Sequence, residues 1–144
     1  MRLLFDTSVL VAAMVESHPM HLRALPWLQR AKNREFTFFA ACHTLAELYA
    51  VLTGLPVSPK IPPAMARNLI EENVKSRAEI VPLSALDYTA VINRMTELGL
   101  SGGAIYDALI VKAAERAHAD HLLTFNGKDF RRVWPDGLDH LMEP

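Results

Sequence analysis

Short apolar runs alternate along this chain with longer segments of mixed apolar and polar positions. "RLLF" (2–5) is a continuous apolar run, which is typical of a buried strand. Three further runs rich in large apolar or β-branched residues also predict strands: "EFTFFA" (35–40), "EIVPL" (79–83) and "HLLTF" (121–125). Strands are therefore expected at four well-separated places.

The segments between these runs predict helices. They extend from the capping residues Asp6, Thr7 and Ser8 to Val15, over 18–34, over 41–54, over 63–75, from Ser84 to Leu98, and over 99–119. Pro26 should kink or divide the second helix, and Gly54 should end the third. The proline-rich stretch 55–63 predicts a stiff connector, and Asn126-Gly127 predicts a turn before "KDFRR".

The alternation of strands and helices indicates an α/β fold. It predicts a parallel sheet covered by helices on both faces, and 144 residues fit a single domain spanning 1–144. Ligands of such sheets bind beyond the carboxyl ends of the strands. Asp6 directly follows the first predicted strand and is expected at such an end.

Composition narrows the possible partners and location. Hydrophobic residues make up 51% of the chain, and the net charge is −1 with a pI of about 6.6. No overall positive field therefore attracts nucleic acid, so a polyanion must be held locally or through a metal ion. Asp6 interrupts the N-terminal apolar stretch where a signal peptide would be unbroken, and no run is long enough to span a membrane. A cytoplasmic protein is expected.

The only cysteine, Cys42, excludes an internal disulfide and a cysteine-based zinc site. Its neighbour His43 raises the alternative of a cysteine nucleophile, but an unpaired cysteine in an apolar helix usually serves packing. Packing is the favoured interpretation.

Three acidic residues each stand alone in an apolar segment. Asp6, Glu47 and Asp107 are the only charged residues within 3–15, 36–59 and 98–111, respectively. Burying an unpaired carboxylate costs several kcal/mol or raises its pKa. Three such groups facing one cavity would repel each other unless a cation compensates, and a hard divalent cation such as Mg²⁺ or Mn²⁺ prefers oxygen ligands. The pattern predicts an acidic metal site.

Each acid also has a simpler interpretation. Asp6 would cap the helix that follows it, and Glu47 would pair with His43 one helical turn earlier. Asp107 would lie on the exposed side of its helix. These alternatives stay open at the level of the sequence.

Four segments in order resemble the PIN-domain ribonucleases, specifically VapC-type toxins of bacterial toxin–antitoxin pairs. They are "LLFDTSVLVAA" (3–13), "TLAELYAVLT" (44–53), "GLSGGAIYDALIVKAA" (99–114) and "LLTFNGKDF" (122–130). The resemblance implies a three-layer α/β/α sandwich with a central, mainly parallel sheet of four or five strands. It also implies an acidic site that binds Mg²⁺ or Mn²⁺ and hydrolyses RNA phosphodiester bonds.

The resemblance assigns roles position by position. Asp6, Glu47 and Asp107 match the first three acids of the family, and the metal is expected on Asp6 and Asp107. The family often has a fourth acid in a T-x-D-x-D-F motif. Here Asn126 stands where the first Asp of that motif would be, and one additional residue precedes Asp129. Both are candidate site residues.

Supporting residues are expected around the acids. Thr7 and Thr124 match polar positions that hold a metal-bound water or a carboxylate. Lys128, Arg131 and Arg132 are candidates for contacts with RNA phosphates, although solvated surface charge is the simpler interpretation.

The resemblance also implies a VapB-like antitoxin as a partner, bound in a groove, and the apolar positions between Met14 and Leu28 are candidates for it. A homodimer contact or core packing would account for the same residues. Two rival functions remain. A Mg²⁺-dependent phosphatase of the haloacid dehalogenase kind needs a second Asp where Ser8 stands, and a catalytically silent RNA- or protein-binding module would not need the isolated acids.

Overall fold

The computed structural model describes all 144 residues of the chain, and its five strands form one sheet. The strands are β1 (Arg2–Phe5), β2 (Thr37–Ala41), β3 (Glu79–Val81), β4 (His121–Leu123) and β5 (Leu141–Met142). Their order is β3-β2-β1-β4-β5, and every neighbouring pair is parallel. All the carboxyl ends therefore lie at one edge of the sheet, with β1 at its centre.

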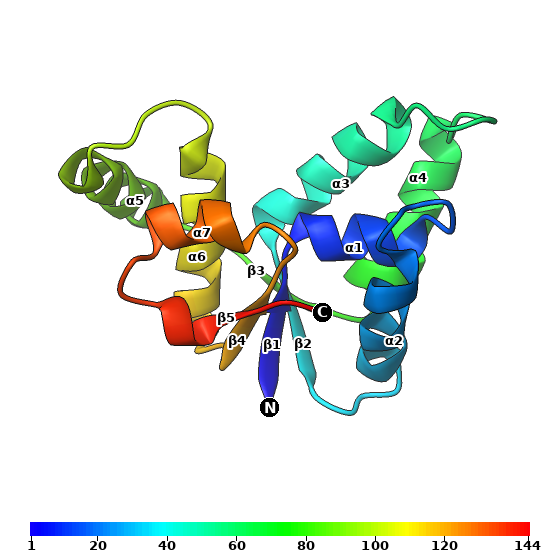
Figure 1. The fold of residues 1–144 in the computed structure, drawn as a ribbon, viewed down its shortest axis with the longest axis horizontal. Helices are drawn as coiled ribbons and strands as arrows, with labels where there is room; N and C mark the ends of the chain where they lie inside the picture. Colours follow the sequence, from blue (N-terminus) through cyan, green and yellow to red (C-terminus); the bar gives the residue numbers. More distant parts are fainter.

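Seven α-helices connect and follow the strands (Figure 1). They are α1 (Thr7–Met14), α2 (His21–Lys32), α3 (Cys42–Gly54), α4 (Pro63–Ile70), α5 (Ala85–Leu98), α6 (Ala104–Arg116) and α7 (Gly127–Val133), with a π-helical turn at Glu71–Lys75 and a 3-10 turn at Leu138–His140. None of these helices is both long and apolar enough to cross a bilayer.

The sheet separates two hydrophobic cores. Leu3 and Phe5 of β1 point into the core built with α1 to α4, whereas Leu4 between them points into the core built with α5 to α7. All three side chains are fully buried. Alternate residues of one strand thus contribute to opposite faces, because successive side chains of a strand point in opposite directions. The predicted three-layer α/β/α sandwich is confirmed.

Several element boundaries differ from the predictions. The two-residue strand β5 was not predicted, because so short a segment carries no periodicity. The predicted helix over 63–75 changes to π-helical hydrogen bonding from Glu71 onward. Pro26 lies inside α2 without dividing it. Asn126-Gly127 is not an isolated turn: "KDFRR" is helical and belongs to α7.

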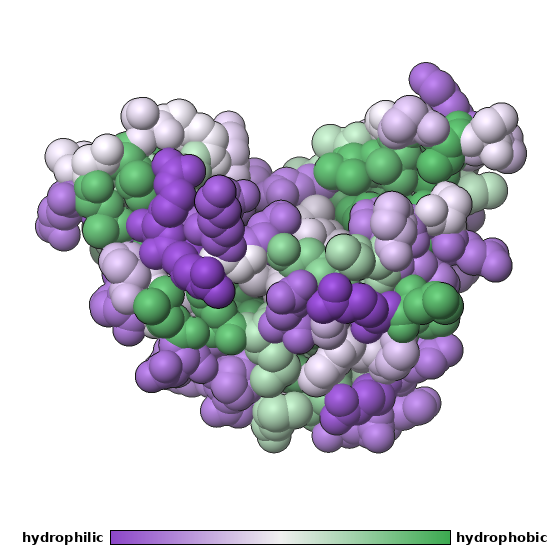
Figure 2. Space-filling model, in the orientation of Figure 1, coloured by the Kyte–Doolittle hydropathy of each residue, from purple (hydrophilic) through white to green (hydrophobic).

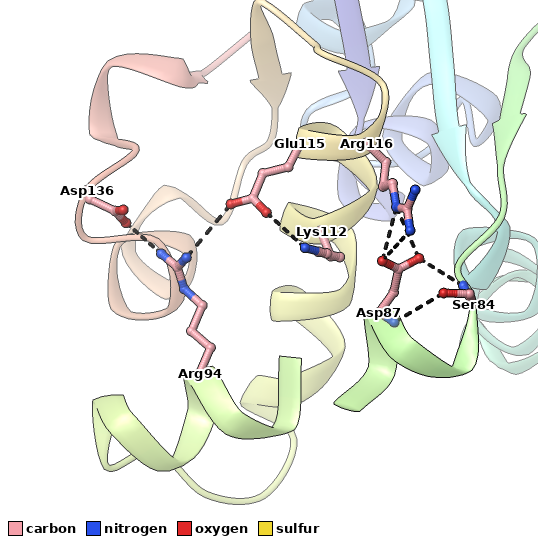
Figure 3. Close-up of polar contacts among 7 residues, drawn as sticks. All are labelled: Ser84, Asp87, Arg94, Lys112, Glu115, Arg116 and Asp136. Atoms are coloured by element: carbon pink, nitrogen blue, oxygen red, sulfur yellow. Dashed lines mark hydrogen bonds and ion pairs between the residues drawn. The ribbon is translucent and has the colours of Figure 1, made fainter. Parts of the chain in front are cut away.

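Helix α5 is fastened to α6 by charged side chains (Figure 3). Ser84 and Asp87 form a capping box at the start of α5, and Asp87 also accepts hydrogen bonds from Arg116 at 2.8–3.1 Å. Arg94 forms ion pairs with Glu115 of α6 and with Asp136 beyond α7. These contacts hold α6, the helix that carries Asp107, in a fixed position against α5.

The Asp87–Arg116 pair should contribute pH-dependent stability. Hydrogen bonds from Arg116 are the main reason why the pKa of Asp87 falls from 3.8 to about 2. A lowered pKa in the folded state stabilises the protein above pH 4, and that contribution is lost as the pH falls towards 2. We expect Arg116→Ala to lower the melting temperature by a few degrees at pH 7, measured by circular dichroism, and by less near pH 2.

The exposed Arg77 provides a matched control, since Arg77→Ala removes an arginine that forms no ion pair. A deficit of Arg116→Ala that is as large at pH 2 as at pH 7 would instead assign its effect to lost packing.

Candidate active site

The predicted acids meet at the carboxyl end of the central strand. A cavity of about 350 Å³ lies there, and Asp6, Glu47 and Asp107 line it. It is also lined by Thr7, Ser8, Val11, His18, Val51, Leu55, Phe125 and Asn126. Figure 2 shows a notch between two protruding parts of the molecule. The surface over α3 on one side of the notch is hydrophobic, and the surface over α7 on the other side is strongly hydrophilic. Residues from four separate segments thus reach one hollow.

Asp6 is held by two hydroxyl groups. It stands at the N-cap position of α1, yet its side chain makes no capping hydrogen bond. Instead Ser8 Oγ and Thr124 Oγ1 donate to its Oδ2 atom at 2.7 and 2.8 Å. The alternative that Asp6 serves as a helix cap is therefore wrong for its side chain. Its carboxylate is oriented into the cavity edge by polar neighbours.

The two hydroxyls are themselves fixed by the backbone. Thr124 Oγ1 accepts a hydrogen bond from the Asn126 N–H at 2.9 Å, and Ser8 Oγ accepts one from the Phe125 N–H at 3.2 Å. Asp6 is only 3% exposed, and this burial raises its pKa, while the bonds from Ser8 and Thr124 oppose the rise. The hydrogen bonds to Asp6 thus offset part, but not all, of the free-energy cost of burying its negative charge.

Glu47 reaches the cavity from α3. Its Oε1 atom lies 2.8 Å from Nε2 of His43, so the predicted pairing along the helix exists. The contact is an ion pair when His43 is protonated, but this buried oxygen receives no hydrogen bond. Burial raises the pKa of Glu47, and the positive charge that His43 carries when protonated opposes the rise. Thr7 is buried beside Glu47, and its hydroxyl group lowers the pKa of Glu47 by a smaller amount.

Asp107 projects from the first turn of α6 and is half-buried, not on an exposed helix face. Its pKa is raised from 3.8 to about 7, first by burial and then by the negative charges of Asp6, Asp129 and Glu47, with Arg132 opposing. Three carboxylates from other segments therefore act electrostatically on this one. Their mutual repulsion is the physical consequence of bringing the acids together.

The candidate site residues that follow β4 do not all line the same cavity. Asn126 is exposed and lines the main cavity. Asp129 lies on α7 and lines a neighbouring hollow of about 380 Å³ together with Asp107 and Arg132. Lys128 and Arg131 are exposed on α7 and line neither hollow. Of the three predicted RNA-contacting cations, only Arg132 lies beside an acid of the site.

The sequence did not assign a site role to Ser8 or His43. Ser8 was recognised only as a capping residue, although the D-x-S spacing at the end of a strand places its hydroxyl next to the carboxylate. His43 was considered as a neighbour of a cysteine nucleophile at Cys42 and as a partner that would make Glu47 structural, but not as part of the acidic site. No three Asp, Glu, His or Cys side chains stand close enough to form a metal-binding group by themselves.

Comparisons with known proteins identify the family of this chain. A profile of the PIN domain family matches residues 3–134. Ribonuclease VapC40 of Mycobacterium tuberculosis is 36% identical over 128 residues, which cover 89% of this chain and 87% of that protein. Ribonuclease VapC27 of Mycobacterium tuberculosis is 34% identical over 116 residues, covering 80% and 78%, respectively.

A solved structure shares the fold over the whole chain. The crystal structure of VapBC2 from Rickettsia felis bound to a DNA fragment from their promoter matches with a TM-score of 0.68 at 24% sequence identity. The match covers 100% of this chain and 99% of that one.

Proposed function

Because this chain belongs to the PIN domain family, we propose that it is a metal-dependent endoribonuclease that acts as the toxin of a toxin–antitoxin pair. Its relatives VapC40 and VapC27 are named ribonucleases and resemble it over most of its length. The observation that carries the proposal is the meeting of Asp6, Glu47 and Asp107 in one cavity beyond the central strand.

The residues of the cavity fit a bound Mg²⁺ or Mn²⁺ ion. Burial raises the pKa of all three acids, and one buried oxygen of Glu47 receives no hydrogen bond. A divalent cation would compensate this negative charge. Mg²⁺ is usually held by only one or two carboxylates together with water, so Asp6 and Asp107 suffice as its protein ligands. When bound, such an ion polarises a phosphoryl oxygen and lowers the pKa of a coordinated water.

The chain's own groups then have distinct tasks. Ser8 and Thr124 hold the Asp6 carboxylate in one orientation through their hydroxyl groups. Glu47, paired with His43, would orient and deprotonate the attacking water. Asn126 and Asp129 would complete the rim of the site. Arg132 would position a phosphate of the RNA. Lys128 and Arg131, further out on α7, would add a salt-sensitive attraction for the RNA backbone.

RNA digestion with controlled metal content tests this function. We expect the purified protein to cleave total cellular RNA in the presence of Mg²⁺ or Mn²⁺, to lose this activity in EDTA, and to regain it when the metal is restored. Gel electrophoresis and mapping of the cleavage ends measure the result. Hydrolysis of p-nitrophenyl phosphate without RNA cleavage would favour the phosphatase alternative, and RNA binding without cleavage would favour the silent module.

A VapB-like antitoxin is the proposed protein partner. The Rickettsia felis structure that shares this fold is titled as a VapBC complex. Of the apolar positions considered for such a groove, Val15 and Leu28 are buried in the core, whereas Leu22 on α2 is 84% exposed and remains available. A homodimer and a cytoplasmic location stay predictions from the sequence.

A further inference from the structure

An aromatic pair bridges two helices beside the acidic cavity. The rings of His43, in the first turn of α3, and Tyr106, in the first turn of α6, are stacked with centroids 5.2 Å apart and planes only 3° from parallel. Tyr106 immediately precedes Asp107, and His43 is paired with Glu47. The stack therefore contacts Glu47 through His43, and its tyrosine is the sequence neighbour of Asp107.

The two rings are not equally accessible. The His43 side chain is 23% exposed and is engaged by Glu47 on one side and by Tyr106 on the other. Tyr106 is 53% exposed, and no hydrogen bond of its hydroxyl group is present. Neither ring lines the cavity itself, but each belongs to a helix that contributes an acid to the lining. An exposed aromatic side chain that is backed by a second ring offers a flat surface to a substrate that extends beyond the cavity.

We propose that Tyr106, backed by His43, is a binding subsite for an unpaired nucleobase of the RNA, next to the phosphate that is cleaved. This inference rests on the proposed ribonuclease function and adds a substrate-binding residue to it. Unpaired bases bind proteins by stacking on aromatic side chains, and each such contact contributes roughly 1–3 kcal/mol to binding.

The charge of the site makes such a contact useful. Asp6, Glu47 and Asp107 line the cavity, and Asp129 lies close enough to act on Asp107. These acids oppose the electrostatic attraction of RNA that the metal and the cations of α7 would supply, so a contact with a base adds affinity that does not depend on charge. A stacked base on Tyr106 supplies it and would also set the register of the chain relative to the acids.

A purely positional role for Tyr106 makes a different prediction. If Tyr106 acted only by holding His43 against Glu47, its removal would lower kcat and leave KM unchanged. Loss of a stacking surface instead raises KM, while turnover at saturating RNA stays close to that of the wild type. The split between KM and kcat therefore separates the two roles.

Direct binding of two homopolymers tests the subsite. Fluorescein-labelled decamers of riboadenylate and ribouridylate are titrated with the Asp6→Asn protein, which is expected to cleave them too slowly to disturb the measurement. Anisotropy gives the dissociation constants. We expect tighter binding of the adenylate, because purines stack more strongly. Adding Tyr106→Ala should weaken adenylate binding about tenfold and remove the preference, whereas Tyr106→Trp should preserve it.

Tyr88 is a matched control, since it is 42% exposed and lies on α5, a helix that contributes no residue to the cavity. Tyr88→Ala should leave both dissociation constants unchanged. The inference is overturned if Tyr106→Ala, placed in the active protein, cleaves RNA with the KM of the wild type, or lowers kcat alone. If the unaltered protein cleaves no RNA with any metal, the proposed function fails first, which is a distinguishable result.

Discussion

Replacing Asp6 with asparagine is expected to lower RNA cleavage by a factor of about 1,000 or more, which corresponds to about 4 kcal/mol of lost transition-state stabilisation. The substitution keeps the shape of the side chain and removes its charge. Asparagine still offers one oxygen to the hydroxyls of Ser8 and Thr124, which now donate to Asp6 Oδ2. The local fold should therefore survive while the charge that would hold the metal is lost. Initial rates on a fluorescent RNA substrate measure the effect.

The stability of this variant distinguishes a functional acid from a structural one. Asp6 is buried with a raised pKa, so its charged form is a cost to folding at neutral pH. We expect the Asp6→Asn melting temperature to equal or exceed that of the wild type. Asp139→Asn, which removes an exposed aspartate, is the matched control and should leave cleavage unchanged. Wild-type cleavage by Asp6→Asn would refute its assignment as a metal ligand.

Asp107→Asn is expected to raise stability in a pH-dependent way as well as to abolish cleavage. The pKa of Asp107 is about 7 in the folded protein against an ordinary value of 3.8. For a raised pKa the folded state loses stability as the pH rises from about 4 to 7, and the loss is complete above 7. At pH 8 the variant should gain roughly 1–2 kcal/mol after allowance for solvent screening, or about 2–6 °C in melting temperature.

Thermal unfolding at several pH values and metal concentrations checks this expectation. The advantage of Asp107→Asn should vanish near pH 4, where both proteins carry a neutral group at this position. Adding Mg²⁺ at pH 8 should stabilise the wild type, because the ion binds only the folded state, and should have little effect on the variant. A gain of equal size at pH 4 and pH 8 would contradict the electrostatic explanation.

Local patterns predicted most of the elements correctly. The apolar runs at 2–5 and 121–125 contain β1 and β4, because a strand buried on both faces needs apolar residues at successive positions. The isolation of Asp6, Glu47 and Asp107 in apolar segments was equally visible, since a lone carboxylate in such a segment has no local partner. Helix α7 was missed as a helix because Asn-Gly is a strong turn signal and the helix is short.

The partners of these acids came only from the tertiary structure. Thr124 donates to Asp6 from 118 positions away, and His43 stacks on Tyr106 across two helices. No local pattern encodes such pairs, because they depend on the register of parallel strands and on how α3 and α6 flank the sheet. The same holds for the division of Asp129 and Asn126 between two hollows.

The sequence by itself thus determined the α/β class and the three acids, because burial and charge act on each residue within its own segment. Only the tertiary structure decided which oxygen of Asp6 accepts hydrogen bonds and that three other carboxylates raise the pKa of Asp107. It also decided that the tyrosine next to Asp107 is exposed. Those properties depend on distances between segments, and the parallel sheet sets them by bringing the ends of its strands to one edge.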